Sequence, residues 1–409
     1  MSLLRSPHLD RRVFLGSTLG GTLALSGCGS NLGGMGFGGS GAGSGIADAP
    51  VSGAAVPTSG DMLGNGSVRV AMILPKSAGG QSAVLAGQLR NAAELALRDF
   101  TGADITILVK DDAGTTEGGR AAASQAVAEG AQMIIGPLNA VSARGVAEPA
   151  RTAGIPVVTF TTDVSVAARG IYLIGFLPAV DVDRIVSYAV MQNRKSMAAI
   201  VPDDAYGVVV EASFRETAAR YGARVMGVER YKGDPADMQT KAATIAKLGA
   251  QIDSVFVPDA GVNAAQVAQA MFSAGLDKSR VKILGSGRMS DPSALASPAL
   301  AGAWFPGTEQ ADVDSFRARY RAAFSSEPGP LAVLGYESVF LAAGLVRNAG
   351  SRPFRDDVLL SRNGFAGRVT GIFRFRPDGT SERGLAVYEV GGGTSRTISP
   401  APKQFPAGT

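Results

Sequence analysis

The first residues of the chain whose type could do chemistry are three pairs of adjacent carboxylates, Asp111-Asp112, Asp203-Asp204 and Asp356-Asp357. General acid–base catalysis uses carboxylates that converge from separate elements, whereas adjacent residues of a strand or loop point apart. Ser279 and Lys282 have the S-x-x-K spacing of penicilloyl-serine enzymes, which need both side chains on one helical turn. Residues 281–284 predict a strand instead, where these two side chains fall on opposite faces. These patterns therefore do not predict an enzyme.

Histidine and cysteine, which often serve as nucleophile, base or metal ligand, are almost absent. The 409 residues include one of each, His8 and Cys28, both near the N-terminus. They allow no intrachain disulfide, no Cys/His metal site and no histidine-based triad. We therefore expect no metal, no other cofactor and no catalytic activity. The net charge of +4, without a run of Lys or Arg, also argues against nucleic-acid binding.

The first 28 residues have the layout of an export signal. A short basic start precedes the apolar residues 13–25, a stretch too short to span a bilayer. Small residues then lead to Cys28, an arrangement that resembles a lipobox, where signal peptidase II leaves a lipidated cysteine. Two or three acyl chains, at about 0.8 kcal/mol per buried methylene, anchor a protein durably. We expect residues 1–28 to be a lipoprotein signal peptide and Cys28 to be the lipid anchor; an ordinary buried cysteine is the alternative.

The export route stays open between two pathways. Arg11-Arg12 with the following Val-Phe-Leu resembles the twin-arginine core, which exports folded proteins, although Asp10 replaces the usual Ser or Thr. A plain basic start of the general export signal is the other interpretation. Gly29 does not resemble an inner-membrane retention signal, so we expect a protein of the cell envelope that faces the periplasm, with the outer membrane favoured over the inner.

Residues 29–66 differ in composition from everything that follows. They contain 13 glycines in 38 residues and only two charged residues, Asp48 and Asp61. Such a segment buries too little apolar surface to offset its chain entropy, so we expect a disordered Gly-rich tether.

From residue 67 onward, short apolar runs alternate with helical patterns. Uninterrupted apolar strands between helices are typical of parallel sheets covered on both faces, which predicts a doubly wound α/β fold. The expected strands are 68–74, 105–109, 133–135 and 155–159, with helices at 83–100, 117–129 and 140–153. A second α/β series fills 171–284, and two helices and a hairpin (371–376 with 385–390) complete the chain. Ligands of such sheets bind at the carboxyl ends of the strands.

This order of elements resembles the type I periplasmic binding proteins, the leucine/isoleucine/valine receptor superfamily, over residues 67–395. The matching motifs are the opening 68–75, Asp111-Asp112, Gly136-Pro137, 154–158, 203–207 and 367–379. The resemblance implies two lobes, each a mostly parallel sheet flanked by helices, between which the chain crosses three times. It implies lobe 1 at 67–178 plus 308–358, lobe 2 at 179–307 plus 359–395, and a C-terminal tail at 396–409, with a cleft between the lobes.

Within that superfamily, the chain most resembles lipoproteins called penicillin-binding protein activators. The resemblance rests on the lipobox, the Gly-rich tether and three short stretches, 110–112, 365–367 and 373–380. It implies a non-catalytic envelope lipoprotein that regulates peptidoglycan synthesis, with a peptidoglycan synthase as partner. The alternative is the substrate-binding lipoprotein of an ABC importer, with an ABC permease and a small amino acid, amide or related solute as partners. A ligandless structural lipoprotein is a third possibility.

Amino-acid receptors of this superfamily use a Ser and a Thr for the ligand carboxylate and an acid for its ammonium group. The resemblance places Ala140 at the first position, Thr161–Asp163 around the second, and Gly287 beside Arg288 at the third. The acid is therefore lost, unless Asp259 or Asp291 replaces it. An unpaired charge in a closed cleft costs several kcal/mol. Without this acid, the cleft would leave the ammonium group of an amino-acid ligand unpaired.

The expected cleft residues come from loops that follow strands in both lobes. They are Ser77, Asn139, Ala140, Ser142, Thr161, Thr162, Asp163, Tyr206, Asp259, Gly287 and Arg288. Purely structural roles remain open for Tyr206, Ser142 and Thr161, which can instead bond backbone groups at helix starts. Asp111-Asp112 is more readily explained by loop amides than by a ligand.

Overall fold

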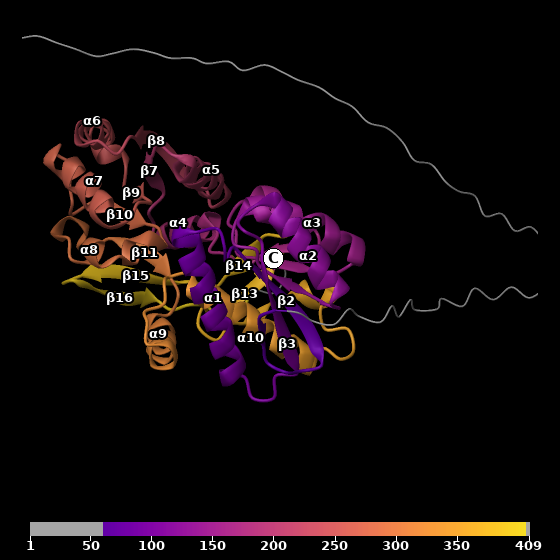
Figure 1. Cartoon of the computed structure of the whole chain (residues 1–409). Coiled ribbons are helices and arrows are strands. Elements are labelled where there is room, and N and C mark those ends of the chain that lie inside the picture. The colour runs from indigo at the N-terminus through magenta and orange to yellow at the C-terminus, as the bar shows by residue number, and fades with distance from the viewer. Residues whose placement is uncertain (1–59, 406–409) are drawn as a thin grey trace, which may run out of the picture. The chain divides into compact units, whose positions relative to one another are not determined.

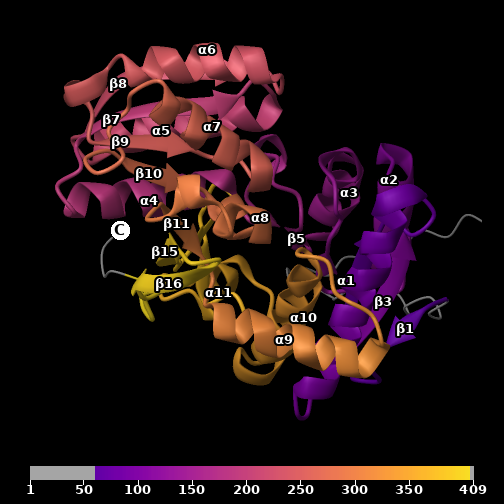
Figure 2. The same ribbon diagram turned by 90° about the vertical axis from the view of Figure 1, so that its left-hand side faces the viewer.

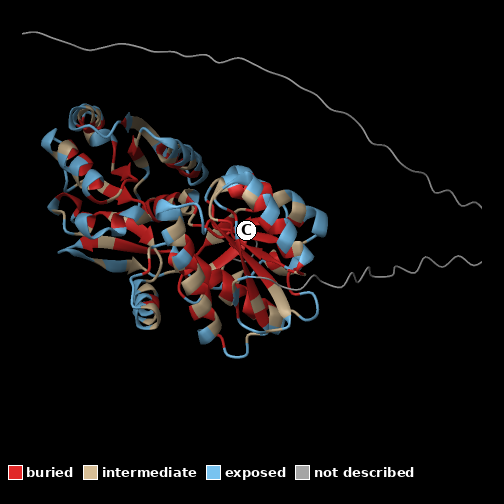
Figure 3. Ribbon diagram, viewed as in Figure 1, coloured by how far each residue is buried: buried red, intermediate tan, exposed pale blue. Residues whose placement is uncertain are grey.

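The computed structural model describes residues 60–405. The predicted signal peptide, Cys28 and most of the predicted tether lie outside the described residues. Two α/β lobes are built around separate sheets, a six-stranded sheet in lobe 1 and a seven-stranded sheet in lobe 2, which confirms the predicted fold class (Figure 1). Buried residues concentrate in the strands of both sheets and on the inner faces of the helices (Figure 3).

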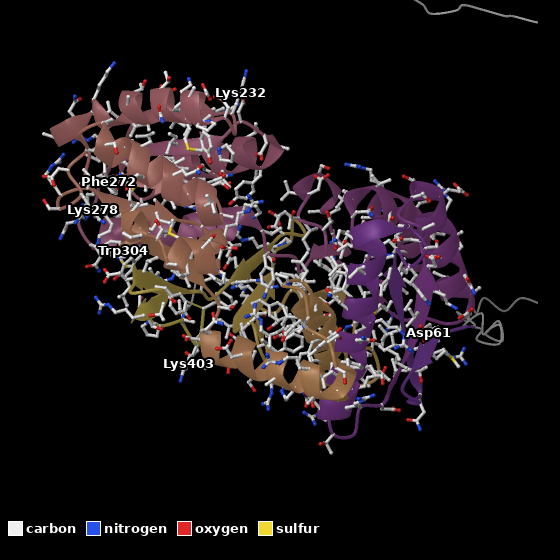
Figure 4. All side chains as sticks on the ribbon, turned by 60° about the vertical axis from the view of Figure 1, so that its left-hand side comes forward. Asp61, Lys232, Phe272, Lys278, Trp304 and Lys403 are labelled. Carbon is white, nitrogen blue, oxygen red and sulfur yellow. The ribbon has the colours of Figure 1, made fainter. Side chains whose placement is uncertain are left out.

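The lobe 1 sheet has the order β1-β3-β2-β4-β5-β6. Its five parallel strands are β2 (Val68–Leu74), β3 (Ile105–Asp111), β4 (Ile134–Ile135), β5 (Val157–Thr159) and β6 (Ile171–Leu173). β1 (Met62–Leu63) pairs antiparallel with β3, so the last residues of the stretch expected to be disordered belong to the sheet. Next to β1, Asp61 (labelled in Figure 4) accepts 2.7 Å hydrogen bonds from Nε and Nη2 of Arg90, which fixes this edge to α1.

Helices cover both faces of the lobe 1 sheet. The apolar sides of α1 (Gly80–Asp99), α9 (Gln310–Phe324) and α10 (Ala332–Asn348) pack into one core, and α2 (Thr116–Ala128) and α3 (Ala140–Ala153) pack into the core of the other face. α3 begins at Asn139, whose side chain accepts from the Ser142 amide, and ends at Gly154 in the left-handed conformation, as good helix caps do.

The lobe 2 sheet has the order β16-β15-β11-β10-β9-β7-β8. Its parallel strands are β7 (Ser196–Pro202), β8 (Arg224–Tyr231), β9 (Ser254–Val257), β10 (Lys282–Gly285) and β11 (Trp304–Gly307). β15 (Ala386–Gly391) and β16 (Thr394–Ser399) extend it antiparallel, so most of β16 lies within the stretch 396–409 expected to be a tail.

The helices of lobe 2 also form two layers, which are seen best in Figure 2. The helices α4 (Pro178–Met191) and α5 (Ala205–Arg220) share one core, and α6 (Pro235–Ala246), α7 (Gly261–Ser273) and the short α8 (Pro292–Leu295) share the other. The parallel strands also have the same order in both lobes: the first strand of each lobe lies between the second and the third.

The last part of the chain contains a small third sheet, and its arrangement differs from the predicted one. This sheet contains β12 (Phe365–Ala366), β13 (Ile372–Phe375) and β14 (Ser381–Arg383), and Phe373 and Phe375 are buried in the lobe 1 core. The hairpin is therefore β13–β14 rather than 371–376 with 385–390. Because these phenylalanines pack on lobe 1, the chain returns to lobe 2 near Leu385 and not near residue 359, and the stretch 359–395 is divided between the lobes.

Candidate functional site

The strand order of each lobe marks where a ligand can bind. Neighbouring strands of a doubly wound sheet send their connections to opposite faces at one switch point, and a crevice opens at their carboxyl ends. In lobe 1 this point lies between β2 and β4, and in lobe 2 between β7 and β9. Most of the predicted cleft residues follow these strands and their neighbours β5 and β10.

The Asp111-Asp112 pair of lobe 1 stabilises its own loops. Asp111 Oδ1 accepts from the amides of Ser77 (3.2 Å) and Ala113 (3.0 Å), and Asp112 Oδ1 accepts from the amide of Gly114 (2.8 Å). Burial raises the pKa of Asp112, which is fully buried, against the opposing effect of these hydrogen bonds. Ser77 is exposed, and its hydroxyl also hydrogen-bonds to Asp111, so a ligand at this loop would compete with that contact.

At the start of α3, the structure separates two of the predicted residues. Ser142 is fully buried and its hydroxyl lies beside Asp112, so it does not face a crevice and its prediction as a cleft residue is not supported by its position. Ala140 is partly buried and packs against a small apolar cluster that includes Leu177 and Val180, residues of the connection from lobe 1 to lobe 2. Backbone amides in the first turn of a helix have no intrahelical acceptor. In α3, the Asn139 side chain accepts from one of them, the Ser142 amide.

The loop after β5 combines an anchored and an open part. Thr161 is buried, and its Oγ1 accepts from the Asp163 amide at 3.1 Å. Asp163 accepts from the Ser165 amide at 2.9 Å and pairs with Arg144 at 3.1 Å. The hydroxyl and the amide of Ser165 are the main cause of the lowered pKa of Asp163, and Arg144 lowers it further. Thr162 is exposed. Lobe 1 thus presents Thr162, Ser77 and the first-turn amides of α3, all of which can donate to an anion.

In lobe 2, Tyr206 and Arg288 form one unit with Ser286. The Tyr206 hydroxyl donates to Ser286 Oγ at 3.1 Å, and the Arg288 guanidinium lies 3.6 Å from the centroid of the Tyr206 ring. Burial raises the pKa of Tyr206 to about 12, so the hydroxyl stays protonated. Among residues 60–405, no acceptor bonds to the guanidinium of Arg288, which is exposed and so free to bind a ligand carboxylate.

Asp181, in the first turn of α4, is a residue that the sequence analysis missed. Its Oδ2 accepts from the Gly287 amide at 2.8 Å, while Oδ1 has no donor in the described part of the chain. Burial raises the pKa of Asp181 to about 6, opposed by the Gly287 hydrogen bond and the charge of Arg288. The only available signal was its place three residues after the expected crossover at 178, because the contact itself depends on folding.

The two acids considered as replacements for the missing one are both engaged. Asp259 is buried, receives a short hydrogen bond from the Tyr231 hydroxyl, and accepts from the Ala260 amide at 2.7 Å. Asp291 caps α8 by accepting from the Ser293 amide at 2.9 Å. Asp181 is therefore the acid with an open oxygen near Arg288.

Apolar side chains are exposed around both sets of loops. Six valines with exposed fractions between 44% and 56% lie in the loops or the first two turns of helices that follow β2, β4, β5, β7 and β9: Val84, Val141, Val164, Val208, Val209 and Val262. They place exposed apolar surface on the same loops and helix starts that carry the polar groups. A site of this composition suits a small molecule with an apolar body and a few polar groups.

These features define a two-lobed binding protein whose polar groups gather at the carboxyl ends of parallel strands. The chain belongs to the periplasmic binding protein family, whose model matches residues 67–394. As a member of this family, it is a non-catalytic binding protein. A comparison with curated proteins finds no match. No helix in the described range 60–405 is long and apolar enough to span a membrane, and within that range no group of three or more His, Cys, Asp or Glu side chains could hold a metal ion.

Solved structures with this fold include binding proteins of ABC transporters. A branched-chain amino acid ABC transporter protein from Rhodospirillum rubrum is similar with a TM-score of 0.70 and 20% identity, over 81% of this chain and 99% of its own. An ABC transporter substrate-binding protein from Sphaerobacter thermophilus has a TM-score of 0.63 and 19% identity, over 83% and 98%. A solute-binding protein from Rhodopseudomonas palustris BisB5, in complex with 3,4-dihydroxybenzoic acid, has a TM-score of 0.57 and 22% identity, over 83% and 97%. At these identities the likeness establishes the fold.

Proposed function

We propose that this protein is the solute-binding component of an ABC importer and that its ligand is a small carboxylate with an apolar body and a hydrogen-bond donor group. The observation that carries the proposal is the Arg288 guanidinium, which lies over the Tyr206 ring without a hydrogen-bond acceptor, near the open oxygen of Asp181. The guanidinium binds the ligand carboxylate, and Asp181 accepts from an ammonium or hydroxyl group.

The opposite wall of the site comes from lobe 1. Closure of the lobes brings Thr162, Ser77 and the first turn of α3 toward the solute, where their donors add to the binding of its carboxylate. The exposed valines then bury the apolar body of the solute. The ligands named for solved relatives, an amino-acid class and an aromatic acid, both fit this description and support the choice of class.

A thermal-shift screen of the exported protein tests this proposal. The panel contains branched-chain amino acids, hydroxybenzoates, simple aliphatic carboxylates, and amides of the same size without a carboxylate. At 100 times its Kd, a ligand stabilises the folded state by about 2.7 kcal/mol, which is a clear rise in Tm. We expect compounds with both a carboxylate and a donor group to raise Tm most. A panel in which the amides equal the matched carboxylates would contradict the proposal.

Regulation of a peptidoglycan synthase is the second candidate function. One support is the set of six exposed valines, which can also contact a protein partner. The other is the resemblance of residues 110–112, 365–367 and 373–380 to activator lipoproteins. It requires the lipid anchor at Cys28, which stays a prediction. Pull-down from native envelope with mass spectrometry separates the two candidates, since recovery of a bifunctional synthase supports activation and recovery of permease subunits supports import.

A further inference from the structure

Lobe 1 contains a second concave site, at the amino ends of β5 and β6 and therefore at the opposite end of the sheet from the candidate cleft. It is a pocket of about 330 Å³ between the last turn of α3, the starts of these two strands and the segment before α11 (Asp356–Leu359). Its wall is apolar where Ile155, Pro156, Ile171 and Phe354 line it. Nothing in the proposed function uses this pocket.

Three arginines and one acid also line the pocket. Asp356 is fully engaged, because Oδ2 accepts from Arg169 Nε at 2.7 Å and Oδ1 accepts from the Tyr172 hydroxyl at 2.9 Å. Arg355 bonds to Asp357, which lies outside the lining, through Nε at 2.9 Å and also through Nη2, which leaves its second terminal nitrogen without an acceptor among residues 60–405. With three cations and one anion the lining itself is positive, and Asp357 beside it offsets one of these charges.

The arginines also have donors to spare. Arg151, in the last turn of α3, forms no ion pair or hydrogen bond with any residue in the described range 60–405, and the two terminal nitrogens of Arg169 have no acceptor there either. Arginine presents its N–H groups in a planar fork that matches the oxygens of phosphate and carboxylate. One whole fork, from Arg151, and the remaining terminal N–H groups of Arg169 and Arg355 come from three separate segments. Such an arrangement suits a tetrahedral anion, which accepts from several directions, better than a planar carboxylate, which accepts in one plane.

We propose that this pocket binds a phosphate-bearing molecule, with the phosphate on Arg151, Arg169 and Arg355 and its organic part on the apolar wall. One feature opposes binding, since α3 ends beside the pocket and the carboxyl end of a helix carries partial negative charge. Arg151 lies in that last turn and offsets this effect. The pocket volume accepts a phosphate together with a glycerol-sized group.

Calorimetric titration of the full chain with inorganic phosphate and with glycerol 3-phosphate, at low ionic strength, tests the proposal. Arg151→Gln is the first variant, because Arg151 has no hydrogen-bond or ion-pair partner among residues 60–405 and its loss should not disturb their folding. We expect its Kd for both probes to rise about tenfold or more, which corresponds to about 1.4 kcal/mol. The matched control is Arg120→Gln, which removes the same charge from an exposed arginine that pairs with Glu148 outside the pocket.

A third probe distinguishes a lipid headgroup from a free phosphate compound. Dihexanoyl phosphatidylglycerol, used below its micelle concentration, binds more tightly than glycerol 3-phosphate if the source is a lipid and less tightly if it is a soluble ester. Either order supports the proposal when Arg151→Gln binds the phosphate probes more weakly than Arg120→Gln does. The proposal is overturned if neither phosphate probe binds at 10 mM, or if Arg151→Gln and Arg120→Gln bind them equally well.

Discussion

The backbone amide of Gly287 donates a 2.8 Å hydrogen bond to Oδ2 of Asp181, which ties the loop after β10 to the first turn of α4. A Cβ atom at residue 287 would lie 3.0 Å from the same oxygen, so a side chain at this position requires the Asp181 carboxylate to shift. An acid at 287 would in addition bring a second negative charge next to Asp181. The loop after β10, where an acid was expected, is instead contacted by the carboxylate of Asp181.

The raised pKa of Asp181 makes a prediction about pH. Its folded-state pKa of about 6 lies above the ordinary value of 3.8, so the carboxyl group favours the folded state when protonated. Its contribution to stability is fully present below about pH 4 and is lost as the pH rises through 6. We expect Asp181→Asn, which keeps the acceptor for Gly287, to be more stable than wild type by about 1–2 kcal/mol at pH 7.5, a value reduced for the partial exposure of this group.

Chemical denaturation of wild type and Asp181→Asn from pH 4 to pH 7.5 measures this effect. Comparison of the two proteins cancels the titration of other acids, and the charged or titratable groups that face Asp181, namely Arg288 and Tyr206, do not change charge in this range. We expect the difference in free energy of unfolding to vanish near pH 4 and to grow toward neutral pH. A difference that is the same at both ends would show that Asp181 has an ordinary pKa.

Arg288 should control affinity for the carboxylate of the solute. Arg288→Met removes a charged donor, whose hydrogen bonds contribute about 1.5–3 kcal/mol, so we expect Kd to rise about 10- to 100-fold. Tyr206→Leu removes the ring under the guanidinium, and loss of that cation–π contact should raise Kd by about two- to fivefold. Titration with the best ligand of the thermal-shift screen gives both values. Arg215→Met, which affects an exposed arginine of α5 paired with Glu211, is the control and should leave Kd unchanged.

The parallel strands and their helices could be predicted because their sequence patterns are local. The expected strand 68–74 is β2 and the expected helix 140–153 is α3, as buried apolar runs and helix caps dictate. The short strands β4 and β5 were expected one or two residues longer. The edge strands β1 and β16 were missed, since their two and six residues lie in Gly-rich or polar sequence whose pairing depends on the neighbouring strand.

The candidate site could be predicted only in part. The predicted strand ends gave the correct edge of the sheet for Tyr206, Thr161, Thr162 and Arg288. A loop begins where its strand ends, so its position can be predicted without knowledge of distant residues. The direction of each side chain is a tertiary property. Ser142 follows a helix start like a binding residue, but it faces the interior, where Gly119 and Gly145 allow α2 and α3 to pack closely. The division of 359–395 between lobes likewise depends on where Phe373 and Phe375 find a core.

Arg383 is predicted to hold two crossover segments together. It ends β14 just before the chain returns to lobe 2, is buried, and donates to the Thr370 hydroxyl at 2.8 Å and to the carbonyl of Ile174, which precedes the first crossover. Burial lowers its pKa to about 10, opposed by the nearby charge of Glu337. Arg383→Met leaves the Thr370 hydroxyl and the Ile174 carbonyl without this donor and removes the positive charge near the buried Glu337, which keeps its three backbone amide donors. We expect a loss of about 1–3 kcal/mol of stability.

Thermal and urea unfolding of Arg383→Met, with Arg396→Met as control, measure that loss. Arg396, on the edge strand β16, pairs with Glu389 of β15, and the Arg396 side chain is 73% exposed. Such surface pairs contribute at most about 1 kcal/mol. Equal stability of the two variants would show that Arg383 does not clamp the crossovers. If Arg383→Met folds, a changed ligand Kd with an intact Arg288 would further connect the clamp to closure of the lobes.

The close approach of α2 and α3 makes the last prediction. A Cβ atom at Gly145 would lie 1.9 Å from the backbone carbonyl oxygen of Thr116, the first residue of α2, and the backbone of two packed helices cannot move aside cheaply. We expect Gly145→Ala to lower the free energy of unfolding by about 1–3 kcal/mol, as overpacking does. Gly87→Ala is the matched control, since Gly87 is an exposed residue of α1 with no atom within 4 Å of its added Cβ. There, alanine should stabilise the helix by about 0.5–1 kcal/mol. Urea unfolding of both variants gives the two signs, and a stabilised Gly145→Ala would mean that the two helices pack less closely than described.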